Sequence, residues 1–467
     1  MTIELRDTLS GRRQPLEPLE PGHVRIYSCG PTVYGPAHIG NFRSFLFADL
    51  LVRYLRWSGL RVTWVMNVTD IDDKIIRGAA TEGVSIADLA ARWLERFIAD
   101  AAALRMTTPD VLPRATHHVD DMVAIIQTLL ESNHAYRTDE GSIFFRIASW
   151  PAYGRLARLD PAQLRVGERV EADEYAKDDV RDFALWKAAK PGEPAWDTAI
   201  GRGRPGWHIE CSAMSMRHLG RSFDIHTGGV DLIFPHHEDE IAQSEAATGE
   251  PFVRTWLHCA HLRMAGEKMA KSTGNIARVA ELLEAGVQAR ALRYALLSVH
   301  YRQTLDYSPE SLAAAGAAVE RLETLESTLS TYVEARPDEP ALGALLADAR
   351  TAFSAALGDD LNISAALAVV FDLARDVNRR IAERSLSTAD AREIGAFLRD
   401  LDRVLAILPD DDRLPSDLQA LVDARAAARL AADWATSDRL RAELVERGVV
   451  VEDTRDGQRW RLAGAAR

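Results

Sequence analysis

The strongest constraint on the fold is a strand–helix–strand pattern near the N-terminus. His23 to Cys29 (HVRIYSC) is typical of a short buried strand, and Arg61 to Val68 (RVTWVMNV) of a second one. Between them, apolar residues recur at helical spacing from Asn41 to a stop near Gly59. A strand, a helix and a second strand within about 45 residues form a βαβ unit, which implies a parallel sheet. We therefore predict an α/β protein with a Rossmann-like parallel sheet.

The pattern changes several times further along the chain. Between Leu112 and Gly206 a helix gives way to an apolar strand and charged loops, and then the strand–helix alternation resumes. Beyond Ser308 the helical spacing is continuous and predicts a helical bundle. We predict a Rossmann-like domain (1–111 and 206–252), a connective insertion (112–205), a region with a lysine-containing loop (253–308), a helical bundle (309–410) and a small α+β domain (418–467).

Composition narrows the setting in which the chain works. Its 467 residues carry only three cysteines and a formal net charge of −13. Three cysteines cannot form a closed disulfide framework, so we expect reduced thiols in the cytoplasm. No secretory leader or membrane span is expected. The negative charge argues against non-specific binding to polyanions, although a local basic surface can still bind RNA.

A glycine-rich loop, CGPTVYGPAHIGN, links the first strand to the first helix. Gly30 and Gly40 allow close backbone approach, and the helix N-terminus offers N–H groups and a positive dipole end to an anion. His38 adds a donor at the same place. The loop suits a nucleotide polyphosphate, but the same glycines are also compatible with a purely structural turn.

A second cationic element lies at GEKMAKSTGN, residues 266–275. Lys268 and Lys271 stand among glycines and small residues, and lysine ammonium groups suit a phosphate whose charge builds during displacement. A solvated surface loop would have the same composition.

Four side chains are candidate metal ligands. His236 and Glu240 are four residues apart and share a helix face, whereas His237 lies about 100° away and is the poorer candidate. Cys29 ends the first strand and Cys211 lies in GWHIECSAMS. Two thiols, an imidazole and a carboxylate are a reasonable tetrahedral zinc set. Buried thiols and surface imidazoles without any metal remain the alternative.

Several segments resemble, in order, those of the cysteinyl-tRNA synthetases, which belong to the class I aminoacyl-tRNA synthetases. They are CGPTVYGPAHIG, NVTDIDDKII, GRPGWHIECSAMS, FDIHTGGVDLIFPHHEDEIAQSEA, EKMAKSTGN and, near the C-terminus, DWATSDRLRAELVERGVVVEDTRDGQRW. HIGN followed by KMAKS also resembles the paired HIGH and KMSKS motifs of class I enzymes. The resemblance runs from about Pro21 to the C-terminus.

The resemblance implies an ATP-dependent enzyme that activates L-cysteine as cysteinyl-adenylate and transfers it to the 3′ end of tRNA(Cys), with Zn²⁺ bound to the protein and Mg²⁺ accompanying ATP. It implies that region 253–308 contacts the tRNA stem and that domain 418–467 binds the anticodon. We expect a monomer.

The resemblance also assigns roles to individual residues. Catalysis is assigned to His38, Asn41, Lys268 and Lys271; ATP binding to Gly30, His38, Gly40, Asn41 and Lys271; cysteine binding to Thr69, Trp207 and His226; and zinc binding to Cys29, Cys211, His236 and Glu240.

The chain departs from the family pattern at a few positions. Asn41 replaces the second histidine of HIGH, and Ala270 replaces the serine of KMSKS. Thr227 stands where a glycine is usual and is expected to tighten the pocket wall beside His226. Arg77 removes one lysine from a KIIK-like segment, so no persulfide side activity is assigned.

Two alternatives remain at this point. One is the related ligase that joins cysteine to a glucosaminyl-inositol in mycothiol synthesis, which lacks the tRNA-binding tail. The other is a silent paralogue that only binds zinc or RNA. In the tail, Trp434 and Trp460 are candidates either for base stacking or for the domain core, beside a basic set of Arg425, Arg429, Arg439 and Arg441.

Overall fold

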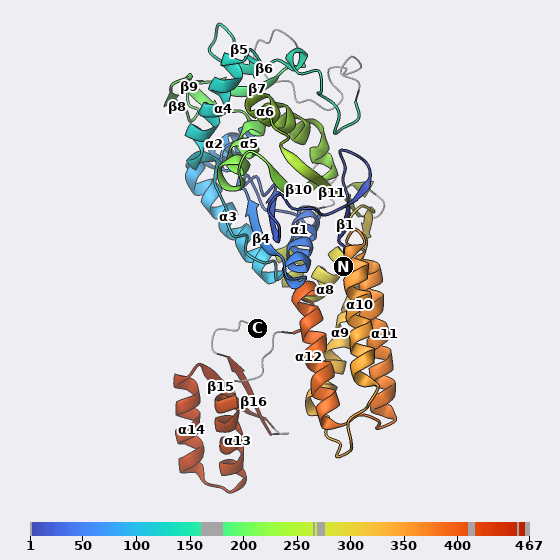
Figure 1. Ribbon diagram of the computed structural model, residues 1–467. Coiled ribbons are helices and arrows are strands. Elements are labelled where there is room, and N and C mark those ends of the chain that lie inside the picture. Colours follow the sequence, from blue (N-terminus) through green and yellow to red (C-terminus); the bar gives the residue numbers. More distant parts are fainter. Residues whose placement is uncertain are drawn as a thin grey trace. The chain divides into compact units, whose positions relative to one another are not determined.

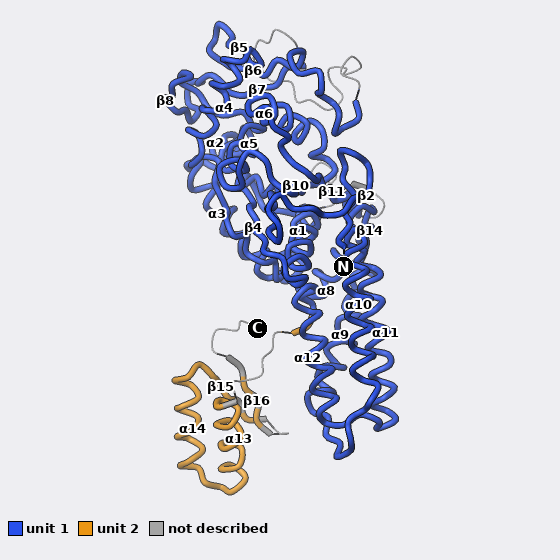
Figure 2. The backbone as a smooth tube through the Cα atoms, viewed as in Figure 1, with its two compact units in different colours: residues 1–407 blue, residues 408–467 orange. Residues whose placement is uncertain are grey.

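The computed structural model describes residues 2–159, 181–264, 267–268, 276–409, 416–454 and 457–462. The chain divides into two compact units, Met1–Ile407 and Leu408–Arg467 (Figure 2). Lys271 and Ala270 lie outside the described residues, and for Lys268 only the backbone is described.

A four-stranded parallel sheet lies at the centre of the first unit (Figure 1). In spatial order the strands are β11 (Val253–Cys259), β10 (Phe223–Gly229), β3 (His23–Ser28) and β4 (Arg61–Met66). Helix α1 (Ile39–Trp57) connects β3 to β4. The predicted βαβ unit is confirmed. The helix starts two residues before the predicted Asn41 because the His38 side chain caps its first turn.

Four further helices accompany this sheet in the chain. They are α2 (Asp73–Glu82), α3 (Ile86–Ala103), α5 (Trp207–Leu219) and α6 (Glu238–Thr248). Regular helix α6 begins slightly after the predicted start near Pro235, because a π-helical turn, Ile233–His237, precedes it and Phe234 within that turn is extended (φ −139°, ψ 132°).

Between β4 and α5 the chain forms an antiparallel sheet with helix α4 (Val119–Glu131) beside it. The strands, in spatial order, are β5 (Ala135–Arg137), β6 (Ile143–Phe145), β7 (Phe183–Ala188), β9 (Gly201–Pro205) and β8 (Trp196–Thr198). Trp186 and Phe145 of this sheet pack in the same buried cluster as Tyr27 and Val65 of the parallel sheet. The shared core fixes the antiparallel sheet against the parallel one.

The rest of the first unit is mostly helical. A small sheet in the order β13 (Glu267–Lys268), β12 (Leu262–Met264) and β14 (Leu305–Tyr307) is followed by a bundle, and a hairpin of β1 (Glu4–Arg6) and β2 (Arg13–Pro15) lies at the N-terminus. The helices are α7 (Val279–Glu284), α8 (Ala289–Leu297), α9 (Pro309–Thr331), α10 (Leu342–Gly358), α11 (Ile363–Ala382) and α12 (Thr388–Leu405).

The second unit is a small α+β fold. Helices α13 (Ser416–Leu430) and α14 (Trp434–Glu446) precede a hairpin of β15 (Val449–Thr454) and β16 (Gly457–Leu462). Its core contains Leu444, Val449 and Val451, with Trp460 packed against it. With the parallel sheet, the antiparallel insertion and the helical bundle, this unit confirms the predicted fold class.

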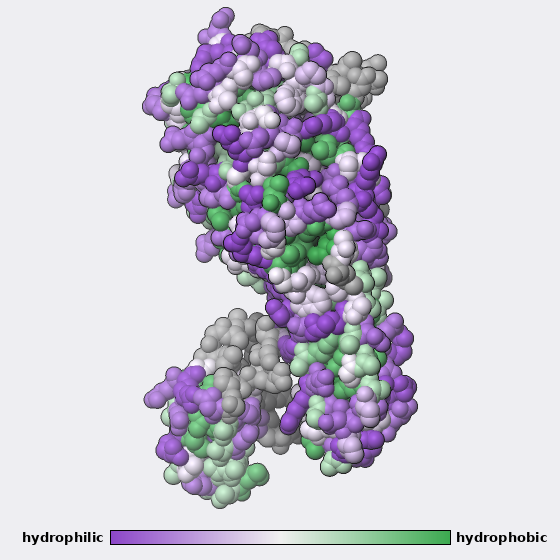
Figure 3. All heavy atoms as spheres, viewed as in Figure 1, coloured by the Kyte–Doolittle hydropathy of each residue, from purple (hydrophilic) through white to green (hydrophobic). Residues whose placement is uncertain are grey.

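The described helices include none long and apolar enough to cross a membrane. On the face of the first unit shown in Figure 3, hydrophilic residues predominate and hydrophobic ones form scattered patches.

A buried ion-pair cluster ties the parallel sheet's first helix to the end of the bundle. Arg293 on α8 is fully buried and donates to Asp49 Oδ2 at 2.7 Å, to the Leu405 carbonyl at 2.7 Å and to the Leu104 carbonyl at 3.0 Å. Arg53 donates to the same carboxylate at 2.9 Å. Burial opposes ionisation of Asp49, but the two guanidinium groups outweigh it and lower the pKa of its carboxyl.

Replacing Arg293 with Met should therefore lower the free energy of unfolding by about 3 kcal/mol, since a buried carboxylate loses a partner and carbonyls lose their donor. Urea unfolding measures this change. Arg375→Met is the matched control, because the Arg375–Asp372 pair is 77% and 67% exposed and should contribute little. Equal losses in both variants would contradict a structural role for the buried cluster.

Candidate active site and metal centre

The four predicted metal ligands converge beside the carboxyl ends of the parallel strands. Cys29 follows β3, Cys211 lies on α5, His236 lies in the turn before α6, and Glu240 lies in the first turn of α6. Cys29 Sγ is 4.0 Å from Cys211 Sγ and 3.9 Å from Glu240 Oε1, and His236 Nε2 is 3.0 Å from the same oxygen. One ligand atom from each of the four lies within 4.8 Å of all the others.

These spacings fit a tetrahedral zinc ion. With Zn–S bonds of about 2.3 Å and Zn–N or Zn–O bonds of about 2.0–2.1 Å, neighbouring ligand atoms are roughly 3.3–3.8 Å apart. Distances of 3.0–4.0 Å between the donor atoms require only small adjustments.

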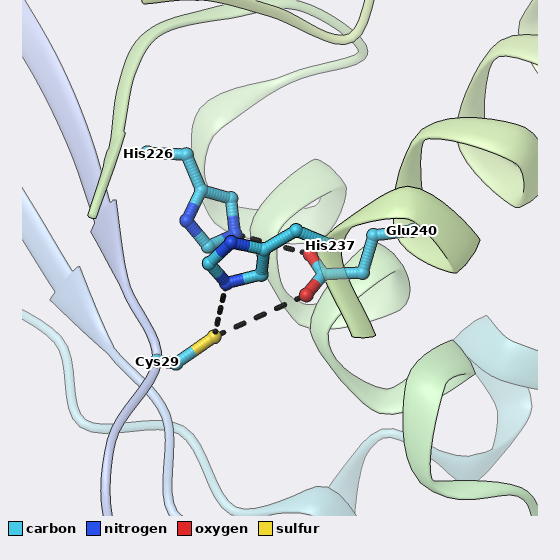
Figure 4. A group of neighbouring side chains, drawn as sticks. All are labelled: Cys29, His226, His237 and Glu240. Carbon is cyan, nitrogen blue, oxygen red and sulfur yellow. Dashed lines mark hydrogen bonds and ion pairs between the residues drawn. The ribbon is translucent and has the colours of Figure 1, made fainter. Parts of the chain in front are cut away.

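A second group meets the same spacing and shares two members with the first. Cys29, His226, His237 and Glu240 point toward one another (Figure 4). His237 Nε2 is 3.3 Å from Cys29 Sγ, and His226 Nε2 is 3.0 Å from Glu240 Oε2. Two thiols occur only in the first group. Because thiolate is the softer zinc ligand, donor chemistry favours the first group over this one.

Neighbouring side chains hold the candidate ligands in place. His208 Nδ1 lies 2.8 Å from His236 Nδ1, and His208 Nε2 lies 3.3 Å from Asp239 Oδ2. With Nδ1 of His236 occupied by His208, its Nε2 is directed at Glu240. In metal sites a histidine ligand is usually oriented in this way, by a partner at the ring nitrogen that does not bind the metal. His208 belongs to the quoted GWHIECS segment, but nothing in its spacing distinguished it from the sequence alone.

A similar contact supports the other imidazole. His237 Nδ1 is 2.8 Å from His258 Nε2, and His258 Nδ1 is 2.8 Å from Thr8 Oγ1. Gly228 makes room for His237, because a Cβ there would stand 2.6 Å from the His237 ring. His258 carried no sequence signal, because it lies within an ordinary buried strand.

Burial determines the protonation states at this site. It raises the pKa of the Cys29 and Cys211 thiols and of the Glu240 carboxyl. It lowers the pKa of His236 well below its usual range and that of His226 to about 3. The imidazoles are therefore neutral at pH 7 and able to act as ligands, while the thiols and the carboxyl hold protons that a cation would displace.

The three residues expected to bind the amino acid all adjoin this cluster. Thr69, buried just after β4, donates to Glu210 Oε2 at 2.9 Å, next to Cys211. The Trp207 ring stacks on His236 with centroids 4.2 Å apart and is 38% exposed, so it stands at the solvent edge. His226 stacks on Trp256 at 4.6 Å.

Thr227 faces away from His226. Its hydroxyl lies 2.7 Å from Ser28 Oγ on the neighbouring strand, and successive residues of a strand point to opposite faces. The expectation that Thr227 narrows the pocket wall beside His226 is therefore wrong; this side chain joins β10 to β3.

The glycine-rich loop ends in a reciprocal cap. The Asn41 N–H donates to His38 Nδ1 at 3.2 Å, and the His38 N–H donates to Asn41 Oδ1 at 3.1 Å. A neutral His38 must then carry its proton on Nε2. Asn41 thus fulfils a capping role at the position that corresponds to the second histidine of the HIGH motif. Gly40 is the second residue of the helix, among the first-turn amides that a helix does not bond internally.

Gly30 has a structural reason as well. Its N–H donates to Asn67 Oδ1 at 2.9 Å, and a Cβ at this position would stand 1.8 Å from the Asn67 carbonyl oxygen. Glycine is therefore required for the β3 and β4 ends to approach.

The lysine-containing segment borders the same helix terminus. The Ile39 N–H donates to the Ala277 carbonyl at 3.0 Å, and Arg278 pairs with His38 through the backbone. Lys268 lies on β13 opposite Arg263. The described C-terminal end of this segment is thus in contact with the HIGN turn.

Comparison with known proteins identifies the family. Residues 15–317 match the family described as "tRNA synthetases class I (C) catalytic domain", residues 352–409 the DALR domain, and residues 411–461 the "Cysteinyl-tRNA ligase anticodon binding domain". The cysteine–tRNA ligase of Alkalilimnicola ehrlichii is 48% identical, covering 98% of this chain and 99% of that protein. That of Koribacter versatilis is 43% identical, covering 99% and 100%. The chain belongs to the cysteine–tRNA ligase family.

Solved structures of other aminoacyl-tRNA synthetases share the fold of this family member. Mycobacterium tuberculosis methionyl-tRNA synthetase in complex with methionyl-adenylate superimposes with a TM-score of 0.59 at 18% identity, over 82% of this chain and 90% of that one. A putative arginyl-tRNA synthetase from Campylobacter jejuni gives 0.55 at 14% identity, over 84% and 94%. The resemblance inferred from the sequence motifs is confirmed, and the chain is an aminoacyl-tRNA synthetase.

Mutation can show which of the two donor groups binds the metal. Cys211→Ala should lower zinc affinity by more than about 100-fold, the largest effect usual for a second-shell residue, because it removes a ligand. Competition with a chromophoric chelator measures the affinity. Cys259→Ala is the matched control, since this third thiol is buried but belongs to neither group. If His237→Gln abolishes binding and Cys211→Ala does not, the second group holds the metal.

Zinc affinity should also rise with pH. Burial raises the pKa of Cys29, Cys211 and Glu240, so these groups hold protons that binding must release. Each released proton weakens apparent binding by up to about tenfold per pH unit of acidification. Chelator competition between about pH 6 and pH 8 tests this linkage. An affinity that stays constant over that range would show that no proton leaves.

Proposed function

We propose that this enzyme activates L-cysteine with ATP to form cysteinyl-adenylate and transfers the cysteinyl group to the 3′ end of tRNA(Cys), working as a monomer in the cytoplasm. The observation that carries the proposal is the largely buried group of Cys29, Cys211, His236 and Glu240, which adjoins Thr69, Trp207 and His226. Family membership and the length of the match support it.

The donor group provides a basis for choosing cysteine over serine. Zinc held by Cys29, Cys211, His236 and Glu240 would supply a soft Lewis-acidic position that prefers sulfur to oxygen. A pocket that discriminates by shape alone rejects an isosteric hydroxyl analogue by only about 10². A preference of about 10⁴ requires only about 5.5 kcal/mol, which a difference between thiolate and hydroxyl ligands can provide without editing.

The pocket residues hold the amino acid in orientation. Trp207 stands at the solvent edge and covers His236, while His226 is held by Glu240 on one side and Trp256 on the other. Thr69 is fixed by Glu210. The side chain of a cysteine bound among these groups is shielded from water. The α-carboxylate of that cysteine is left to face the nucleotide.

Adenylate formation is then a matter of positioning and electrostatics. The cysteine carboxylate oxygen attacks the ATP α-phosphorus, and the bond to the leaving pyrophosphate, which Mg²⁺ accompanies, breaks. His38, Asn41 and the Gly40 N–H at the start of α1, with Gly30 shaping the loop, hold the phosphates, and Lys268 and Lys271 stabilise the developing negative charge. In the second step the terminal tRNA hydroxyl attacks the adenylate carbonyl carbon and AMP leaves.

The remaining regions are proposed to bind tRNA. We assign 1–111 with 206–252 to catalysis, 112–205 to the connective insertion, 253–308 to stem contact, 309–410 to the bundle and 418–467 to the anticodon. In the second unit Trp434 is 58% exposed and able to stack on a base, whereas Trp460 packs against the core. Arg425 is buried and bonded to Asp453, so it supports the domain and is not part of the basic surface.

Neither alternative is favoured. The cysteine–glucosaminyl-inositol ligase was distinguished by its lack of a tRNA-binding tail, and residues 411–461 of this chain match an anticodon-binding family. A silent paralogue is disfavoured because the relatives that this chain matches over almost its full length are cysteine–tRNA ligases.

Cysteine-dependent ATP–pyrophosphate exchange tests the proposal. The wild-type enzyme should prefer cysteine to serine in kcat/KM by about 10⁴ or more, and Cys211→Ala should reduce that preference toward about 10² because only shape remains. Thr227→Gly is the control and should keep the preference, since Thr227 faces the other side of the sheet. Wild-type enzyme without exchange would refute the activity, and unchanged selectivity in Cys211→Ala would refute the metal's role.

A further inference from the structure

Helix α1 carries a buried arginine just after its HIGN turn. Arg43 is 2% exposed and its guanidinium donates to three main-chain carbonyls: those of His261, at 3.1 Å, His300, at 3.4 Å, and Gln303. Burial lowers its pKa, which the neighbouring Cys259 thiol partly offsets, and among the described residues no carboxylate pairs with it. A cation buried against carbonyls and a thiol, with no carboxylate beside it, is costly, so its contacts must do something that an apolar side chain of similar size cannot.

The three carbonyls belong to the starts of two strands. His261 immediately precedes β12, while His300 and Gln303 precede β14. Strand β12 pairs in parallel with β14 on one side and antiparallel with β13 on the other, where Arg263 lies opposite Lys268. Arg43 therefore fastens both strands that support the strand carrying Lys268. A planar fork of five N–H donors can bridge such carbonyls, and no other side chain offers this geometry.

The other end of the lysine-containing segment is fastened to the same helix. Ala277 accepts from the Ile39 N–H, and Arg278 pairs with His38 through the backbone. One helix thus presents His38 and Asn41 at its N-terminus, holds the exit of the segment at its first residue and holds the entry through Arg43.

We infer that Arg43 is a positioning residue that sets the separation between the phosphate-binding turn of α1 and the strand that carries Lys268. The inference rests on the proposed function, since it assumes that Lys268 and Lys271 act on ATP. Arg43 itself touches no substrate. Misplacing a reactive group by about 1 Å can cost about 10²-fold in rate, so loss of this clamp should be visible in turnover rather than in amino-acid binding.

The test is cysteine-dependent ATP–pyrophosphate exchange with Arg43→Met and Arg43→Lys. Arg43→Met should lower kcat by about 10²-fold while KM for cysteine and bound zinc remain within twofold of wild type. Arg43→Lys keeps the charge but not the planar set of N–H donors, so its kcat should lie between those of Arg43→Met and the wild type. Urea unfolding of each variant establishes that it is folded.

A double-mutant cycle separates positioning from a general structural role. In an enzyme already lacking both lysines (K268A/K271A), adding Arg43→Met should reduce the residual rate by less than about threefold, because nothing is left to position. The matched control is Arg293→Met, because Arg293 is also buried and also donates to carbonyls. The factor by which Arg293→Met lowers the exchange rate should be the same with and without the two lysines.

The outcomes distinguish the two levels of the claim. An active wild-type enzyme in which Arg43→Met keeps its kcat, raises KM for cysteine, or multiplies fully with the lysine loss would overturn the inference and leave the proposed function standing. A wild-type enzyme without exchange would overturn the proposed function itself.

Discussion

The buried carboxylate of Glu240 is the interaction on which the site depends. Its two oxygens meet His226 and His236, each at 3.0 Å, and Cys29 lies 3.9 Å from one of them. His226, His236 and Glu240 come from a strand, a turn and a helix that follow one another in the chain, whereas Cys29 ends a strand about 200 residues earlier. Burial leaves the carboxyl reluctant to ionise, so a cation is the partner that best relieves the cost of placing it there.

The parallel sheet makes this meeting possible. Because β3, β4 and β10 run in the same direction, Cys29, Thr69 and the turn before α6 all emerge at one edge. Helix α1 starts at that same edge, so the candidate metal ligands and the turn proposed to bind the nucleotide are built at one edge of the sheet. The buried Asp49–Arg293 pair then joins α1 to the end of the bundle, so this helix contacts both the parallel sheet and the bundle.

Some of the site could be predicted from the chain, and some could not. His236 and Glu240 were identified as a pair because helical spacing alone places them on one face, and the structure brings them into contact. His208, His258 and Asn67 were missed, because their contacts with His236, His237 and Gly30 depend only on which segments pack together. Thr227 was misassigned for the same reason: strand alternation about Ser28 decides its direction, and motif position does not.

The sequence by itself determined the order of the elements, the βαβ start and the identity of the family, since these follow from periodicity and from motifs contiguous in the chain. Only the tertiary structure decided that both candidate donor groups share Cys29 and Glu240, that Trp434 is exposed while Trp460 packs inward, and that Arg43 clamps two strand ends. The physical reason is that local spacing fixes which face a side chain occupies, whereas long-range packing alone fixes what lies opposite it.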